Sequence, residues 1–392
     1  MCYSNVKIGF PNTIGTNQEE TLKILHYITN AFGGVDKRLY LMPLLLAGIS
    51  ILMMVSTSYD HGAFTDHTVM IQSTAYVLGF IAVVVIANIN YTAFVDWTKW
   101  LYIGSIVFLL TVYIPGLGVE LNGARSWINL GITTFQPSEI VKITFILLFA
   151  NYLEKHKDEL RYVTGVLKAM GYCAPIIVIV LKEDLGSALV FAAVWVTMLF
   201  YAGIRGSLFA KGCAAVALMV PISYNFMAPH QKERINAFLH PDNLSIGANY
   251  QVWQSKVAIG SGGFFGKGLF HGTQKGLKFL PVRNSDFVFS VIVEELGFLG
   301  GAVVIAAYSF LIYAMMKVAK NCKDTFGTLI VIGVIAMFTF QIFENIAMTM
   351  GAMPVTGITL PFLSYGGSSV LANLMALGFV INIAVHSKNV QF

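Results

Sequence analysis

The sequence is poor in charged residues. Asp, Glu, Lys and Arg make up only 11% of its 392 residues, whereas soluble domains contain about 25%. This scarcity excludes a water-soluble globular domain as the main architecture. The net charge is only +5, and the basic residues are spread over many segments instead of forming one stripe, so no nucleic-acid partner is indicated.

Cysteine is also scarce. The four cysteines, Cys2, Cys173, Cys213 and Cys322, show neither a CxxC motif nor the spacing of a metal site. The sequence therefore predicts no disulfide framework and no metal site. It also lacks a strong internal repeat, so nothing indicates the two inverted halves of a transporter.

Long apolar runs stand where the charge is missing, and 56% of the residues are hydrophobic. These runs are about as long as a helix that crosses a hydrocarbon layer of ~30 Å. The predicted fold is therefore an all-α, polytopic membrane bundle of about ten transmembrane helices. The expected spans lie near 40–57, 69–89, 98–114, 138–153, 168–181, 186–202, 207–226, 286–316, 326–350 and 366–386.

Lysine and arginine indicate how this bundle is oriented. With a cytoplasmic N-terminus, the short outer loops contain only Arg125 and Lys182, and basic residues favour the cytoplasmic side. We therefore expect both termini in the cytoplasm, a polar segment at 1–38 without a signal-peptide pattern, and a single transmembrane domain at 39–392. Three polar segments then face outside, where we expect the chemistry: 115–137, 182–185 and a large loop at 227–285 between the seventh and eighth helices.

Three acids stand at the start of the eighth span, in PVRNSDFVFSVIVEELGFLGG. Asp286 lies at the outer membrane face, where it could be a helix N-terminal carboxylate or a catalytic carboxylate. Glu294 and Glu295 lie deeper and point about 100° apart, so both avoid lipid only if protein or a wet cavity surrounds this helix. They are interpreted as buried carboxylates that bind neighbouring helices, with direct catalysis as the alternative.

Two motifs in and after the first outer loop carry cations and an aromatic residue. In NGARSW, Arg125 suits a phosphate, while Trp127 suits either a sugar face or the interfacial aromatic belt. In QPSEIVK, Glu139 and Lys142 are three residues apart and hence neighbours on one helix face. Lys142 could bind a lipid phosphate with Glu139 holding it, or the two could form only an internal ion pair.

The remaining candidates lie in the other outer segments. Asp184 in KEDLGS could be a helix cap, a solvated turn residue or part of a site. Lys256 belongs to a glycine-rich, cationic stretch at 250–276, which is a candidate re-entrant or interfacial flap without the spacing of a nucleotide-binding loop. Helix-breaking Pro and Gly residues at 354–369 indicate irregular backbone that protein or a cavity must cover. Together these segments suit an anionic, lipid-linked sugar.

Taken in order, these segments resemble the SEDS family (shape, elongation, division and sporulation) of bacterial peptidoglycan glycosyltransferases. The resemblance covers the chain from the first span to near the C-terminus. The tract QIFENIAMTMGAMPVTGITLPF is most similar to RodA, the elongation branch, and FtsW or a sporulation member stays open. The motifs that carry it are NGARSW, QPSEIVK, DLGSA, YQVWQS, AIGSGGFFGKG, SDFVFSVIVEELGFLGG and NIAMTMGAMPVTGITLPFLSYGGSS.

The resemblance implies polymerisation of lipid II on the outer face of the bacterial cytoplasmic membrane, with release of undecaprenyl pyrophosphate. It assigns the family's essential aspartate, the general base, to Asp286, its loop tryptophan to Trp127 and its QPSE-to-Lys pattern to 136–142. A class B penicillin-binding protein and other elongation-complex membrane proteins are the implied partners. A divalent cation such as Mg²⁺ or Mn²⁺ is allowed, but no ligand set is evident.

Departures from the family pattern and rival functions remain. Many members have Arg directly before the loop Trp, whereas Ser126 stands there, so the phosphate contact of Arg125 is in question. The alternatives to an enzyme are a lipid II flippase, which would depend on Glu294 and Glu295, and a scaffold for a transpeptidase.

Overall fold

The computed structural model describes residues 35–58, 67–121, 124–131, 133–243, 247–276, 279–280 and 282–386. Most of the expected cytoplasmic segment 1–38 and Asn122 of the NGARSW motif lie outside these residues. The chain from Lys37 onward forms one compact unit.

Each of the ten expected spans coincides with one helix. Six of these helices, α2, α3, α7, α13, α14 and α15, are long and apolar enough to cross a membrane, and the chain is a multi-pass membrane protein. The number of ten spans and the side of each terminus remain predictions. The helices are α2 (Arg38–Ser58), α3 (His67–Asn88), α5 (Thr98–Leu110), α6 (Pro137–Lys155), α7 (Val163–Glu183), α8 (Leu185–Tyr201), α9 (Gly206–Ser223), α13 (Val288–Asn321), α14 (Thr325–Thr349) and α15 (Gly367–His386).

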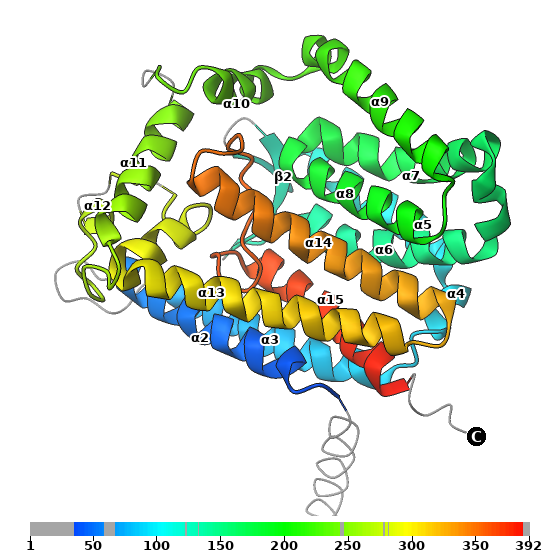
Figure 1. The fold of residues 1–392 in the computed structure, drawn as a ribbon, viewed down its shortest axis with the longest axis horizontal. Helices are drawn as coiled ribbons and strands as arrows, with labels where there is room; N and C mark the ends of the chain where they lie inside the picture. The colour runs from blue at the N-terminus through cyan, green and yellow to red at the C-terminus, as the bar shows by residue number, and fades with distance from the viewer. Residues whose placement is uncertain are drawn as a thin grey trace, which may run out of the picture. The chain divides into compact units, whose positions relative to one another are not determined.

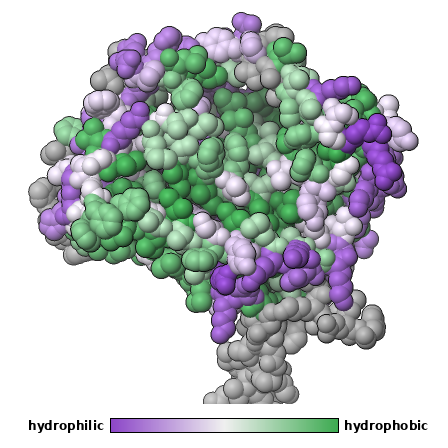
Figure 2. All heavy atoms as spheres, in the orientation of Figure 1, coloured by the Kyte–Doolittle hydropathy of each residue, from purple (hydrophilic) through white to green (hydrophobic). Residues whose placement is uncertain are grey.

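The interior of this unit is built around α14 and α15, the two most buried of the long apolar helices. Helix α13 lies beside α14, α15 packs against α3, and α14 packs against α8 (Figure 1). By contrast, α2, α3 and α7 expose many large apolar side chains. Figure 2 shows hydrophobic side chains over the middle of the face in view and hydrophilic ones toward its margins, as expected where lipid surrounds a bundle.

The segment expected to be the first outer loop contains a small sheet, which departs from a purely helical fold. Strands β1 (Gly118–Leu121), β2 (Ala124–Asn129) and β3 (Thr134–Phe135) are antiparallel in the order β1-β2-β3. Val119 pairs with Trp127, and Ile128 pairs with Phe135. Burial alternates along β2, where Ser126 and Ile128 are buried, but the six residues do not alternate between polar and apolar types, and a search for long apolar runs misses the strand.

The expected long outer loop is also largely ordered into helices. It contains α10 (Pro229–Leu239), α11 (Gly247–Gly262) and the short α12 (Thr273–Gly276). Helix α11 packs along α13. The loop after α11 therefore meets the first half of α13.

Helix α13 is interrupted at Gly297, where φ is 69° and ψ is −167°. The interruption frees main-chain groups, and the loop after α11 satisfies them. The amides of Lys267 and Gly268 donate to the carbonyls of Glu294 and Glu295, both at 3.0 Å, and the amide of Phe298 donates to a loop carbonyl at 2.9 Å. A Cβ on Gly297 would lie 2.3 Å from a loop main-chain nitrogen, so only glycine fits. Covered in this way, irregular backbone is tolerated at membrane depth.

Candidate active site

A polar cleft lies where the N-terminal ends of α6, α8 and α13 meet. Its cavity volume is about 240 Å³. Strand β2, helix α10 and the loop between α14 and α15 complete its walls. The charged and aromatic side chains that line it are Trp127, Glu139, Lys142, Asp184, Arg234, Asp286 and Tyr365.

Asp286 precedes the first residue of α13 by two positions and faces this cleft. Burial raises the pKa of its carboxyl from 3.8 to about 6. A hydrogen bond from Ser285 and the positive charge of Arg234 act in the opposite direction, while the negative charge of Asp184 adds to the increase. A carboxylate with such a pKa is charged at neutral pH and is a stronger base than an ordinary aspartate.

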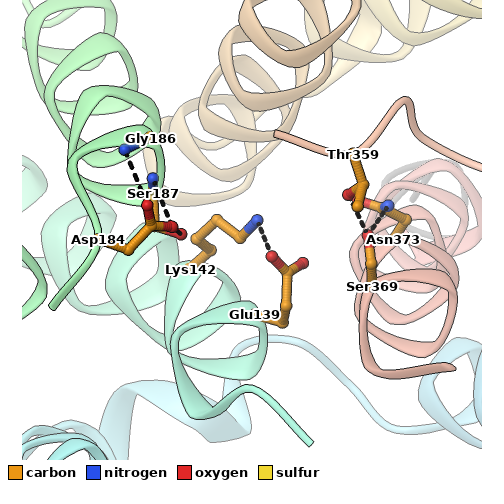
Figure 3. A network of polar contacts seen from close by, with 8 residues as sticks. All are labelled: Glu139, Lys142, Asp184, Gly186, Ser187, Thr359, Ser369 and Asn373. Atoms are coloured by element: carbon orange, nitrogen blue, oxygen red, sulfur yellow. Dashed lines mark hydrogen bonds and ion pairs between the residues drawn. The ribbon is translucent and has the colours of Figure 1, made fainter. Parts of the chain in front are cut away.

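Glu139 and Lys142 form a buried ion pair in the first turns of α6. Pro137 begins this helix, and the three-residue spacing brings the Lys142 Nζ to 2.8 Å from the Glu139 Oε1 (Figure 3). Lys142 is only 3% exposed at its side chain. Within the described part of the chain, the second carboxylate oxygen of Glu139 has no hydrogen-bond partner. The pair therefore presents one fixed cation and one unused acceptor to the cleft.

Asp184 caps helix α8. Its carboxylate accepts hydrogen bonds from the amides of Gly186 and Ser187, both at 3.1 Å, and from the Ser187 hydroxyl at 2.6 Å (Figure 3). This geometry matches the helix-cap interpretation. Because Asp184 also lines the cleft, it adds negative potential near Asp286.

Arg234 is a cleft cation that the sequence did not single out. It lies on α10, and its Nη1 donates to the carbonyl of Thr356 at 2.6 Å. The residue after Thr356, Gly357, lies close to both Arg234 and Asp286. A Cβ there would be 3.6 Å from the Asp286 Oδ2 and 3.8 Å from the Arg234 Nη1. No motif surrounds Arg234, so only its tertiary contact with this loop reveals it.

Two expected cations lie outside the wall of this cleft. Arg125 is exposed on β2 and extends over β1, where a Cβ on Gly118 would lie 3.1 Å from its Nε. Its neighbours Ser126 and Trp127 do line the cleft. Lys256 on α11 lines a separate cavity of about 30 Å³ that shares Arg234 with the main cleft. The main cleft therefore takes its positive charge from Lys142 and Arg234.

The matching family model is described as "Cell cycle protein" and covers FtsW, RodA and SpoVE proteins. It matches residues 37–389. The chain belongs to the FtsW/RodA/SpoVE family. This is the SEDS family that the motifs predicted.

Curated relatives within the family come from several branches. The chain is 34% identical to stage V sporulation protein E of Bacillus subtilis, covering 90% of this chain and 98% of the relative. It is 37% identical to a probable peptidoglycan glycosyltransferase FtsW of Trichlorobacter lovleyi, covering 90% and 94%. It is 36% identical to peptidoglycan glycosyltransferase MrdB of Escherichia coli, covering 79% and 84%. These names agree with the expectation of a glycosyltransferase.

Solved structures of family members have the same fold. A chain from a study of polymerisation and crosslinking by a peptidoglycan synthase complex superposes with a TM-score of 0.78 at 29% identity, covering 91% of this chain and 99% of that one. The rod shape determining protein RodA of Thermus thermophilus gives 0.66 at 28% identity, covering 89% and 96%.

Glu294 and Glu295 of this family member lie away from the cleft, in the first half of α13. Both are fully buried. Glu294 accepts from the Lys267 Nζ at 2.7 Å, from Thr273 at 3.1 Å and from the amide of Gln274 at 3.0 Å. Glu295 accepts from the hydroxyl of Ser56 on α2 at 2.7 and 2.8 Å. The two acids thus connect α13 to the loop after α11 and to α2.

The divalent cation that the SEDS resemblance allows finds no ligand cluster here. Among the described residues, no group of three or more His, Cys, Asp or Glu side chains is placed to hold a metal ion.

Proposed function

We propose that this chain is a peptidoglycan glycosyltransferase that polymerises lipid II into glycan strands. The observation that carries the proposal is that Asp286 shares one polar cleft with Lys142 and Arg234. A base beside two cations is what transfer of a sugar from a diphosphate requires. Membership of the family and the names of its relatives support the same activity.

The cations bind the diphosphate of the lipid-linked donor. Arg234 offers a planar guanidinium that suits two phosphate oxygens, whereas Lys142 offers a point charge fixed by Glu139. Trp127 lies in the wall beside them and packs against a sugar ring. Arg125 and Lys256 contribute positive charge from outside this wall and attract the anionic substrate at longer range.

Asp286 is the general base. Its carboxylate takes the proton from the acceptor 4-hydroxyl while that oxygen attacks the anomeric carbon of the donor. The new glycosidic bond forms as the bond to the diphosphate breaks, undecaprenyl pyrophosphate leaves with the electron pair, and the anomeric centre inverts. General-base catalysis of this kind contributes about 10² to 10⁴ in rate. The leaving group needs no acid because the bound cations stabilise its charge.

The cleft faces the outside of the cytoplasmic membrane in this proposal, as the distribution of basic residues predicts. The elongation role rests on the similarity of the tract 341–362 to RodA. A class B penicillin-binding protein is the proposed partner, because one structural neighbour comes from a peptidoglycan synthase complex.

The placement of the acids favours an enzyme over a flippase. A proton-coupled transporter needs acids that reach water near the middle of the membrane. Glu294 and Glu295 are instead buried and bonded to Lys267 and Ser56. Of the three acids in 281–301, the one that faces the cleft is Asp286, just before the start of α13.

The test compares Asp286→Ala with the parent in polymer formation from purified lipid II, in the presence of the partner. We expect the variant to fold, to bind the partner and to lose polymerisation by at least about 10²-fold. Glu295→Gln, which retains a hydrogen-bond acceptor for Ser56, is the matched control and should polymerise like the parent. Polymerisation that survives Asp286→Ala would refute the assigned base. Growth supported by that variant would instead favour a scaffold.

A further inference from the structure

Two adjacent polar residues of the buried helix α14, Glu344 and Asn345, lie behind the cleft without lining it. Both are fully buried. They are neighbours on the helix, and a buried polar group costs free energy unless it makes good hydrogen bonds. Their partners are therefore informative.

Glu344 is connected to the cation of the cleft through one intervening residue. Its Oε1 accepts a short hydrogen bond from the hydroxyl of Thr356. The main-chain carbonyl of Thr356 accepts from the Arg234 Nη1 at 2.6 Å. One residue of the loop thus joins the buried carboxylate to the guanidinium.

Asn345 is connected to the base. Its Nδ2 donates to the main-chain carbonyl of Asp286 at 3.0 Å and to the carbonyl of Ile358 at 2.8 Å. The single amide group therefore fixes the segment that carries the base and the loop that faces it. Ser364 holds the other side of this segment, because its hydroxyl donates to the carbonyl of Ser285 at 2.5 Å.

The two connections meet in three successive loop residues. Thr356 is held by Glu344 and Ile358 by Asn345, while Gly357, the residue between them in the chain, lies next to both the carboxylate of Asp286 and the guanidinium of Arg234. The position of Gly357 requires glycine, since its φ is +75°. The geometry of the base and the cation therefore depends on how α14 holds this turn.

We propose that Glu344 and Asn345 are a pair of positioning residues that together set the separation between Arg234 and Asp286 across the Gly357 turn. This inference rests on the proposed function, in which Arg234 binds the diphosphate and Asp286 accepts the proton. Neither residue touches the substrate. A displacement of about 1 Å at a reacting group can reduce the rate about 10²-fold, so control of this spacing matters to catalysis.

The two residues act on different steps, and their substitutions therefore give different kinetics. Asn345→Leu removes the donor to the Asp286 carbonyl and the donor to the Ile358 carbonyl, so kcat should fall about 10- to 100-fold while KM stays within about twofold. Glu344→Leu removes the acceptor that holds Thr356, so the main effect should be a rise in KM of about 10-fold. Glu344→Gln keeps an acceptor oxygen and should remain close to the parent.

The pH profile adds a readout that a merely structural role would not change. Asp184, Arg234 and Glu344 surround Asp286 from α8, α10 and α14. When Asn345→Leu releases the base segment toward water, burial raises the pKa of Asp286 less, and the acid limb of kcat should move to lower pH. Loss of folded protein alone would lower the activity without moving this limb.

Gln341 offers a matched control on the same helix. It is as buried as the pair, and among the described residues neither of its side-chain polar atoms has a hydrogen-bond partner. Gln341→Leu should therefore retain the kinetics of the parent. The proposal is overturned if Asn345→Leu and Glu344→Leu behave like this control, or if both lower kcat equally with unchanged KM and pH profile.

Hydrogen–deuterium exchange tests the positioning without any enzymatic activity. Asn345→Leu should speed exchange of the amides in 284–287, and Glu344→Leu should speed exchange in 355–357, relative to Gln341→Leu. Unchanged exchange in both segments would overturn the proposal. If the parent itself makes no polymer from lipid II, the proposed function fails, and the exchange result still decides whether the pair positions these segments.

Discussion

The two ends of the buried first half of α13 carry acids in opposite environments. Asp286, just before the helix, faces a cleft of about 240 Å³ beside two cations. Glu294 and Glu295, about 12 Å further along the helix, are fully buried and bonded to Lys267 and Ser56. All three lie in one sequence stretch that resembles a membrane helix. The difference lies in what the carboxylate oxygens face.

This comparison separates a reactive acid from a connecting acid. Glu294 accepts three fixed hydrogen bonds and Glu295 accepts from Ser56, so both acids hold α13 to its neighbours, and neither lines the cleft of Asp286. Asp286 is raised in pKa by burial and keeps an open side, so it can exchange a proton with a bound hydroxyl. The position of an acid along α13 is thus a weaker guide to its function than the groups that its carboxylate oxygens contact.

The largest expected effect on stability comes from the connecting end. Glu294→Ala leaves the charge of Lys267 without its partner and frees the loop after α11, and removal of one member of a buried ion pair costs about 3–5 kcal/mol. We expect a value near the lower limit, since the Lys267 side chain is 24% exposed. The measurement is the apparent melting temperature of the purified protein in detergent.

The double variant Lys267→Met with Glu294→Leu is the control for this prediction. Removing both charges leaves no unpaired ion, so part of the lost stability should return. Equal melting temperatures for the single and double variants would show that the ion pair is not what holds this end of α13. Glu294 would then not be the acid that connects α13 to the loop after α11.

Much of the architecture could be predicted from the sequence because hydropathy reports which segments leave water. All ten expected spans coincide with helices, and the QPSEIVK spacing correctly placed Glu139 beside Lys142. The small sheet was missed because β2 has only six residues. A strand that short is not detected by a search for spans of about 20 residues.

The cleft was only partly predictable because it is assembled from segments distant in the sequence. Arg234 lies in a polar helix without a motif, and its role depends on a carbonyl 122 residues further along the chain. Conversely, Arg125 and Lys256 have the right charge in the right segments, but the fold places them outside the cleft wall. Local sequence specifies the type of side chain, whereas tertiary packing decides which side chains meet.

The pH dependence of activity tests the role of Asp286, the acid at the cleft end. Asp286 must be charged to act as a base, and burial raises its pKa to about 6. Polymerisation should therefore be constant above about pH 7 and fall about tenfold per pH unit below about pH 6. Initial rates between pH 4.5 and 8.5 check this expectation.

Substitution of Ser285 should move the acid limb of the pH–rate profile to higher pH. Its hydrogen bond stabilises the charged form and lowers the pKa of Asp286. Ser285→Ala should therefore shift the acid limb to higher pH, while the hydrogen bond from the Ser364 hydroxyl to the main-chain carbonyl of residue 285 persists. A limb that stays in place would contradict the assignment of the titrating group to Asp286.

The smallest expected effect is a gain in stability from removing the reactive charge. The folded-state pKa of Asp286 is raised above its ordinary value, so this group favours folding below about pH 4, and its contribution is lost as the pH rises through about 6. Asp286→Asn is neutral at every pH and avoids that loss. We expect its apparent melting temperature at pH 7.5 to exceed that of the parent by about 1–2 °C, because about 1 kcal/mol shifts the melting temperature of a chain of 392 residues less than that of a smaller domain. The difference should vanish near pH 3, where Asp286 is protonated in both the folded and the unfolded chain. An equal gain at both pH values would mean that the charge of Asp286 does not reduce stability.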